Sequence, residues 1–138
     1  MAITKQKGDI AEAFIVYLLR QKGFNVLVPW GEDNRYDLVT EKNGVFKRIQ
    51  VKYATPKDGV VEVRIRSCNN HDVIHYSQKD VDIIAVYAPG KDKVYFVPLK
   101  SITNKSLCKL RFKPAKNKQK KLIILASTYE SRFDLLER

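Results

Sequence analysis

Three polar side chains whose types suit phosphate chemistry lie in two short segments of the chain. Asp37 lies in the first segment, and Gln50 and Lys52 lie in the second. The carboxylate of Asp37 is a hard oxygen ligand for a cation such as Mg²⁺, and the amide oxygen of Gln50 is a weaker, neutral one. The ammonium group of Lys52 can hold an attacking water molecule and counter the charge of a phosphate. This combination suits phosphodiester hydrolysis, which requires positive charge beside the phosphate and an activated water.

An Asn-Gly pair at 43–44 predicts how the two segments meet. Asn-Gly is a strong hairpin signal, because a type I′ turn needs positive φ at both central residues. In such a two-residue loop Lys42 pairs with Val45, and counting back along both strands places Asp37 opposite Gln50. Residues opposed in this way share a face of the sheet, with their Cβ atoms about 5 Å apart.

The alternation of side chains then separates two faces of this hairpin. Lys52 and Arg48 each lie two residues from Gln50, so they share its face and that of Asp37. The opposite face receives an apolar set that we expect to pack against a core, which consists of Tyr36, Leu38, Ile49 and Val51. A slip of one residue would bury the polar set instead, so the apolar set favours this register.

Glu12 is a fourth candidate because of its place in an amphipathic helix. Residues 5–22 have helical periodicity, and Gly23 is a natural C-terminal stop. Apolar residues follow Glu12 at three, four and seven positions, so we expect it to be partly buried. A carboxylate there needs a cation or an ionic partner, because burying it alone is costly. Taken singly, each of the four residues fits a solvated surface or a structural ion pair; together they favour a site.

The charge of the chain indicates a polyanionic partner. Its 138 residues include 26 Lys and Arg against 15 Asp and Glu, a net charge of +11. Nucleic acid is the commonest partner of so basic a small domain, although a basic ribosomal-type or thermostable surface would look the same.

The length suits one domain, and no apolar run is long enough to span a membrane. Cys68 and Cys108 lack metal-ligand spacing, so we expect reduced thiols and a cytoplasmic location with access to DNA.

The order of the expected elements predicts an α/β (α+β) fold with a mixed sheet. After the helix at 5–22, strands are expected at 24–28, 36–41, 45–53, 60–66, 81–87 and 94–97. Residues 69–78 have the composition of a loop. Residues 122–136 fit a helix better than a strand, although 122–125 alone would suit a strand.

Three short motifs resemble those of the PD-(D/E)xK nuclease superfamily. They are Gly8-x3-Glu12, Tyr36-Asp37-Leu38 and Gln50-Val51-Lys52. The narrower resemblance is to the small group I intron-associated homing endonucleases in which glutamine replaces the second acidic residue. It extends over roughly residues 4 to 130 and includes the stretches at 80–87, 93–98 and 110–114.

The resemblance implies a fold, a site and a cofactor. The fold would be a restriction-endonuclease-like core, with residues 1–138 as a single nuclease domain, the N-terminal helix packed on a central mixed sheet, and further helices flanking it. Asp37 would be the principal metal ligand, and Gln50 would stand where an acid usually ligates. Lys52 would position the nucleophilic water, and Glu12 would bind a second metal ion or its water. The cofactor would be Mg²⁺, with Mn²⁺ as a substitute.

The resemblance also implies double-stranded DNA as the partner, bound by a dimer or a tetramer. The sequence departs from the superfamily at two positions. Tyr36 replaces the proline of the motif, and this proline takes no part in the chemistry. Gln50 removes one negative charge, which weakens the case for tight binding of a second metal ion.

Basic residues outside the motifs are candidates for contacts with the DNA backbone. Arg64 and Arg66 share the polar face of the strand expected at 60–66, and Arg48 shares the face of the site residues. The stretch 105–121 carries eight Lys or Arg residues, among them Lys113, Lys116 and Lys118. The alternatives are a solvated strand face and a basic loop without fixed structure.

These observations favour a Mg²⁺-dependent, site-specific DNA endonuclease of the homing type. Two alternatives stay open. One is a Holliday-junction resolvase, which shares the core motif. The other is a catalytically inactive DNA-binding module, in which Gln50 marks a decayed site.

Overall fold

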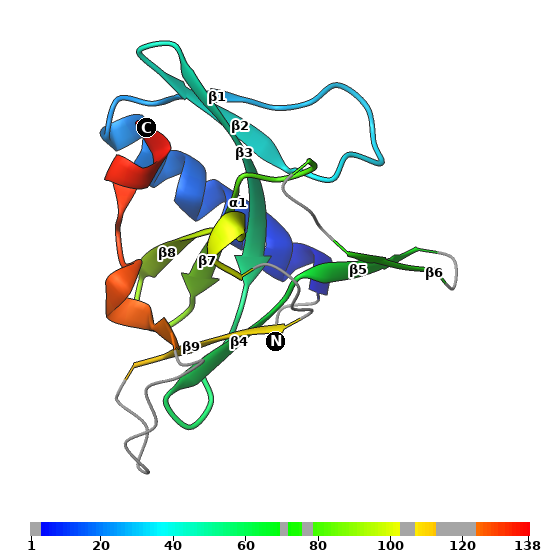
Figure 1. The fold of residues 1–138 in the computed structure, drawn as a ribbon, viewed down its shortest axis with the longest axis vertical. Helices are drawn as coiled ribbons and strands as arrows, with labels where there is room; N and C mark the ends of the chain where they lie inside the picture. The colour runs from blue at the N-terminus through cyan, green and yellow to red at the C-terminus, as the bar shows by residue number, and fades with distance from the viewer. Residues whose placement is uncertain (1–3, 70–71, 76–78, 103–106, 113–123) are drawn as a thin grey trace.

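The computed structural model describes residues 4–69, 72–75, 79–102, 107–112 and 124–138, of which 66–69, 72–75 and 107 are described by their backbone alone. The described part contains one α-helix, α1 (Thr4–Gln21), three β-sheets and three short 3₁₀-helices. No helix in these ranges is both long and apolar enough to cross a membrane. Figure 1 shows β4 (Val60–Arg64) and β9 (Leu107–Arg111) at one end of the molecule, and the hairpin of β5 (Arg66–Asn69) and β6 (Asp72–His75) projecting to one side.

The central sheet is mixed, as the sequence predicts. Its strand order is β1-β2-β3-β7-β8, with β3 and β7 parallel and all other neighbours antiparallel. The strands are β1 (Asn25–Leu27), β2 (Leu38–Lys42), β3 (Val45–Tyr53), β7 (Ile83–Ala88) and β8 (Lys93–Pro98). The turn between β2 and β3 has positive φ at both central residues, 53° at Asn43 and 82° at Gly44, so the hairpin and its predicted register are confirmed.

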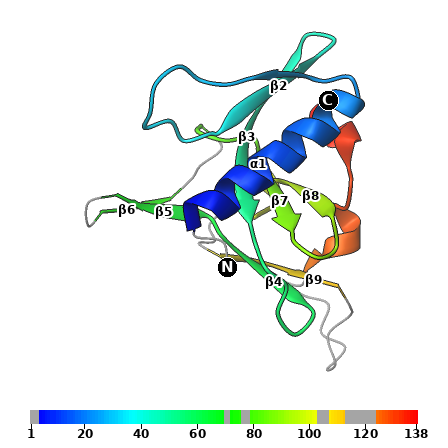
Figure 2. The ribbon, with the colours of Figure 1, turned by 180° about the vertical axis from the view of Figure 1, so that it is seen from behind.

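Helix α1 covers one face of this sheet (Figure 2). Its buried residues are Ala11, Ile15 and Leu19, each one turn from the next. They pack in one cluster with Ile49 and Val51 of β3, which are the apolar residues that the sequence assigns to this face. Burial of this stripe, more than helix propensity, holds α1 against the sheet.

The helix ends at a glycine that allows a left-handed turn. Gly23 has φ 85°, and its N–H donates to the carbonyl oxygen of Arg20 at 3.1 Å. The N–H of the next residue, Phe24, reaches back to the carbonyl oxygen of Leu19 at 3.0 Å. This is the Schellman arrangement, which satisfies the last carbonyl groups of a helix. Phe24 is fully buried, so the chain enters β1 with its direction fixed.

A second, smaller sheet covers the other face. It consists of β4 (Val60–Arg64), β9 (Leu107–Arg111) and β10 (Ile124–Leu125), with β4 and β9 antiparallel. Val61, Val63 and Ile65 are buried and Glu62 and Arg64 are exposed, which confirms the alternation expected for 60–66. The buried residues pack in one cluster with the β7 and β8 residues that face away from α1.

The prediction of a helix at 122–136 is wrong for the residues in this range that the structure describes. Residues 124–125 form β10, and only two 3₁₀-helices follow, η2 (Ala126–Thr128) and η3 (Phe133–Leu136). The intervening chain pairs with the outer edge of β8: the Phe96 N–H donates to the carbonyl oxygen of Tyr129 at 3.0 Å, and the Ser131 N–H to that of Val94 at 2.9 Å. The backbone groups at this edge of β8 find hydrogen-bond partners in the C-terminal chain, and this pairing outweighs the helical periodicity of residues 122–136.

The loop expected at 69–78 is also partly wrong. β5 (Arg66–Asn69) and β6 (Asp72–His75) form an antiparallel hairpin. The hairpin projects from the rest of the molecule (Figure 1), so its strands are defined by backbone pairing with each other. The apolar alternation that identifies a strand in a sequence arises from packing on a core.

Replacing Ile15 by alanine tests the packing of α1 on β3. Ile15 is fully buried, so Ile15→Ala should lower the free energy of unfolding by about 2–5 kcal/mol in urea denaturation. Ile10→Ala is the matched control, because Ile10 lies in the same helix but is 41% exposed, and it should cost less than about 1 kcal/mol. Equal losses in the two variants would contradict the packing described here.

Candidate active site

The candidate site lies where β2 stops pairing with β3. The ladder between them ends at the pair Leu38 and Ile49. Beyond Ile49, β3 continues beside β7 only, and its other edge has no strand partner in the described part of the chain. Such an edge leaves backbone N–H and C=O groups that need other partners.

Asp37 supplies one of these partners. Its N–H donates to the carbonyl oxygen of Ile49 at 2.8 Å, which continues the ladder by one residue. Its carboxylate Oδ2 accepts the N–H of Val51 at 2.7 Å. Two contacts with β3 therefore fix the carboxylate at the strand edge, beside the segment that carries Gln50 and Lys52.

Asp37 and Lys52 influence each other electrostatically. Burial raises the pKa of Asp37, while the Val51 N–H and the ammonium group of Lys52 act to lower it. Burial lowers the pKa of Lys52, and the carboxylate of Asp37 acts to raise it. In each group the cost of desolvating a charge exceeds the gain from its partner. The pair thus lies together at the edge of the sheet, as the predicted register requires.

Glu12 approaches the same place from α1. Its side chain is half-buried, and its pKa is raised first by burial, then by the negative charges of Asp37 and Asp9. The repulsion between Glu12 and Asp37 indicates that α1 and the strand edge bring these two carboxylates near each other.

Gln50 completes the predicted set by register. It lies beside Ile84 of β7, on the same face of β3 as Lys52, and it is half-buried. Two carboxylates and an amide oxygen form a hard donor set of the kind that Mg²⁺ prefers, and a cation would relieve the repulsion between the carboxylates. In the described ranges no three His, Cys, Asp or Glu residues group closely enough to hold a metal ion, and Gln50 is the third oxygen donor of the predicted set.

Arg48 is held by a partner that the sequence analysis missed. Its guanidinium forms an ion pair with Asp82 at 3.0 Å, and its backbone N–H donates to the same carboxylate at 2.7 Å. It also donates to the carbonyl oxygen of Lys79. These contacts fasten β3 to the start of β7, so any phosphate contact of Arg48 would be additional. No local signal identifies Asp82, because the pair depends on strands 34 residues apart.

The other basic candidates lie at different places. Arg64 is exposed on β4. Only the backbone of Arg66 is described, in β5. Lys113, Lys116 and Lys118 lie outside the described residues. Their contacts with DNA stay predictions.

The prediction that Tyr36 shares the apolar face with Leu38, Ile49 and Val51 is wrong. It precedes β2 and packs against the cluster on the opposite side of the sheet. The alternation that the prediction assumed begins only at Leu38, where the strand begins.

Comparison with known proteins identifies the family. Residues 2–132 match the profile of the PD-(D/E)XK endonuclease family. The chain belongs to the PD-(D/E)XK endonuclease family. The superfamily assignment made from the motifs is therefore confirmed, and it is a family of nucleases that act on DNA.

Similar proteins agree with this assignment. The PD-(D/E)XK chain is similar to Protein 5.3 of Escherichia phage T7, with 31% identity over an alignment that covers 57% of this chain and 68% of the phage protein. Its structure resembles that of the bacterial homing endonuclease I-Ssp6803I, with a TM-score of 0.78 and 26% identity over 97% of this chain and 93% of the other.

A more distant structural neighbour shares the fold alone. It is Hjc, a Holliday junction resolvase from Archaeoglobus fulgidus, with a TM-score of 0.50 and 16% identity over 76% of this chain and 84% of that one. With the helix on a mixed sheet, these likenesses show the restriction-endonuclease-like fold that the sequence analysis expects for a PD-(D/E)XK protein.

Replacing Asp37 by asparagine tests the electrostatics of this PD-(D/E)XK site. A carboxyl group with a raised pKa contributes stability that is present below its unfolded pKa and is lost as the pH rises through its folded pKa. Asn keeps an oxygen that can accept from Val51 but does not titrate. In the absence of divalent metal, the melting temperature of Asp37→Asn should therefore rise relative to wild type between about pH 3 and pH 7.

Asp33→Asn is the matched control, because Asp33 is exposed in the loop before β2. Its melting temperature should follow that of the wild type at every pH. A melting temperature of Asp37→Asn that falls relative to the wild type as the pH rises would show that the carboxylate is stabilising in the folded state, against this account.

Proposed function

We propose that this PD-(D/E)XK protein is a Mg²⁺-dependent, site-specific endonuclease that hydrolyses phosphodiester bonds in double-stranded DNA, as homing endonucleases do. The supporting observation is the edge of β3, where the carboxylate of Asp37 is fixed by the Val51 N–H and interacts electrostatically with both the ammonium group of Lys52 and the carboxylate of Glu12. The net charge of +11 suits a DNA substrate.

Asp37 would be the central ligand of the divalent cation, with Glu12 and Gln50 as the other protein oxygens. Bound there, the cation supplies positive charge to the scissile phosphate and lowers the pKa of water. The contact with Val51 keeps the Asp37 carboxylate oriented before any ion binds, so little reorganisation is needed on binding.

Lys52 would hold the attacking water and balance the charge that develops on the phosphate. Its half-buried position makes the ammonium group a stronger electrostatic partner than a fully solvated one. Burial also lowers its pKa, so the group gives up a proton more readily than an ordinary lysine. Because one such site cuts one strand, cutting a duplex calls for two, and the proposal includes a homo-oligomer.

Removing either charged group should abolish cleavage and leave the protein folded. Asp37→Asn and Lys52→Ala should each lower the cleavage rate by at least about a hundredfold, because each removes a group that acts on the transition state. DNA affinity, measured by fluorescence anisotropy in EDTA, should change by less than about threefold, since most affinity comes from backbone contacts elsewhere. Asp33→Asn and Lys47→Ala, from the preceding loop and from β3, serve as controls.

The cleavage assay uses a randomised duplex library with Mg²⁺, Mn²⁺ or EDTA, followed by sequencing of the cut ends. Recurrent ends that require metal support a site-specific endonuclease. Undiminished cleavage by both site variants refutes the assignment of the site. Preference for four-way junctions over duplex would identify a resolvase instead, and inactivity on supercoiled, linear and branched DNA would identify a non-catalytic binding module.

The donor set of Glu12, Asp37 and Gln50 carries only two negative charges, because Gln50 is neutral. A glutamate at position 50 should add a third negative charge. Gln50→Glu should lower the Kd for Mg²⁺ by about tenfold or more in isothermal titration, because Mg²⁺ affinity rises with the charge of its ligands. The same variant without metal should melt at a lower temperature than wild type, since a further carboxylate joins two that already repel. An unchanged Kd would place residue 50 outside the metal site.

A further inference from the structure

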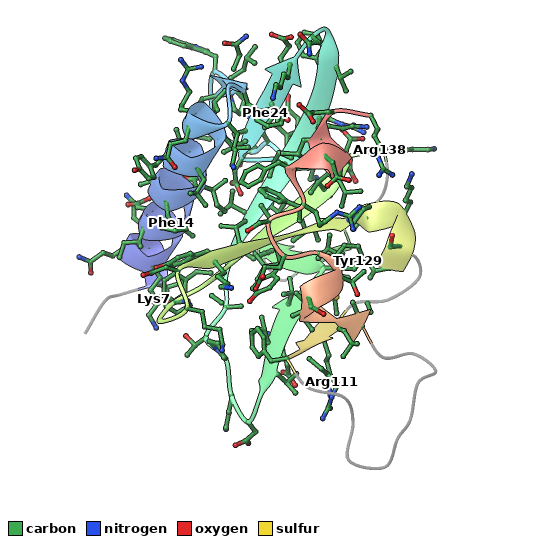
Figure 3. All side chains as sticks on the ribbon, turned by 90° about the vertical axis from the view of Figure 1, so that its left-hand side faces the viewer. Lys7, Phe14, Phe24, Arg111, Tyr129 and Arg138 are labelled. Carbon is green, nitrogen blue, oxygen red and sulfur yellow. The ribbon has the colours of Figure 1, made fainter. Side chains whose placement is uncertain are left out.

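A hollow of about 510 Å³ lies on the outer face of β4 and β9, apart from the candidate active site. Val60 pairs with Arg111 and Glu62 with Lys109 on this face, while the alternate residues of both strands point into the core. The turn after β3 closes one side of the hollow with Thr55, Lys57 and Asp58. Figure 3 shows Arg111 on β9, at the end of the molecule far from Arg138.

The guanidinium of Arg111 has an unused donor. Its Nε is buried and has no hydrogen-bond partner among the residues that the structure describes. A buried donor without an acceptor is costly, and in most proteins such a group is paired. Guanidinium groups bind phosphate oxygens through pairs of N–H groups, so an anion in the hollow would supply the missing acceptor after a small rotation of the side chain.

The charges around the hollow also favour an anion. Three cations line it against two carboxylates, Asp58 and Glu62. Glu62 is engaged with Lys109, at 3.7 Å between two largely exposed side chains. Among the described residues no ion pair involves Lys57 or Arg111, which leaves two cations available to a ligand.

The rim of the hollow is held in place by its backbone. Lys57 and Val60 exchange two hydrogen bonds of 2.8 and 3.0 Å around a turn whose central residues, Asp58 and Gly59, both have positive φ. The Phe112 N–H donates to the carbonyl oxygen of Gly59 at 2.9 Å and ties the end of β9 to this turn. Lys57 and Arg111 are thus carried on one fixed frame.

The same turn links the hollow to the candidate active site. Thr55 lies three residues after Lys52, and Lys57 lies five residues after Lys52. The Cα of Lys57 is therefore within about 19 Å of the Cα of Lys52. DNA advances 3.4 Å for each base pair, so this reach corresponds to at most about six base pairs along a duplex. A single DNA molecule could therefore contact both places.

We propose that this hollow binds a phosphodiester group of the DNA backbone a few base pairs from the scissile bond, with Arg111 and Lys57 as its ligands. The inference rests on DNA being the substrate, as the proposed function holds. Its role is to fix the register of the duplex on the protein, because phosphate contacts position DNA without reading its sequence.

NMR of the arginine side chains tests the site directly. The Nε–H resonance of Arg111, assigned by its loss in Arg111→Lys, should shift on titration of wild type with a 5′-hydroxyl duplex in EDTA. Inorganic phosphate and a 5′-phosphorylated mononucleotide are the comparison probes and should produce the shift only at much higher concentration. Saturation by the mononucleotide at concentrations where the duplex has no effect would overturn the proposal in favour of a terminal phosphate.

The energetic test compares variants in duplex binding without metal. Arg111→Gln should weaken binding about tenfold near 0.1 M salt and reduce the slope of log Kd against log salt by about one. Lys57→Gln, on an exposed turn that tolerates the change, should show the same trend and guards against misfolding of the first variant. Arg138→Gln removes the same charge at a distant, exposed position and should change affinity by less than about threefold.

The outcomes separate this inference from the proposed function. If wild type binds duplex, and Arg111→Gln and Lys57→Gln behave like Arg138→Gln, the hollow is not a DNA site, whatever the cleavage assay shows. If the hollow variants lose affinity but wild type cleaves nothing, the inference holds and the nuclease proposal fails.

Discussion

The packing of α1 on one face of strand β3 determines where the protein can hold polar chemistry. Ile49 and Val51 face α1 and are buried, so charged groups are excluded from this face of the strand. Arg48, Gln50 and Lys52 lie on the opposite face, where they are only half-buried. The edge beside Gln50 and Lys52 does not pair with β2, because that ladder ends at Leu38 and Ile49. Asp37 stands at that edge because it satisfies the Val51 N–H, so one hydrogen bond serves both the fold and the site.

This placement creates a tension between stability and function. Burial raises the pKa of Asp37 and of Glu12 and lowers that of Lys52, so the folded protein disfavours all three charges. The same low-dielectric surroundings strengthen the interaction of these charges with a cation and a phosphate. Groups that are costly in the free protein are typical of functional sites, because the ligand and not the fold balances their charge.

Local patterns in the sequence predicted the parts of the structure that depend on neighbours along the chain. The Asn-Gly turn fixed the β2–β3 register, helical periodicity predicted α1, and alternation predicted β4. Long-range pairing escaped the same reasoning. The parallel contact of β3 with β7 brings Asp82 to Arg48, and the bare edge of β8 draws the C-terminal chain away from a helix. The hollow beside Arg111 depends in the same way on the pairing of β4 with β9.

The central claim is that the edge of β3 holds a divalent cation through Asp37, with Glu12 and Gln50 around it. A crystal soaked in Mn²⁺ and measured near the manganese absorption edge would test it most directly, because the anomalous signal locates the ion without assumptions about its ligands. The account predicts one strong peak within about 2.2 Å of a carboxylate oxygen of Asp37 and within reach of Glu12. A peak at another place, with none beside Asp37 at saturating Mn²⁺, would contradict it.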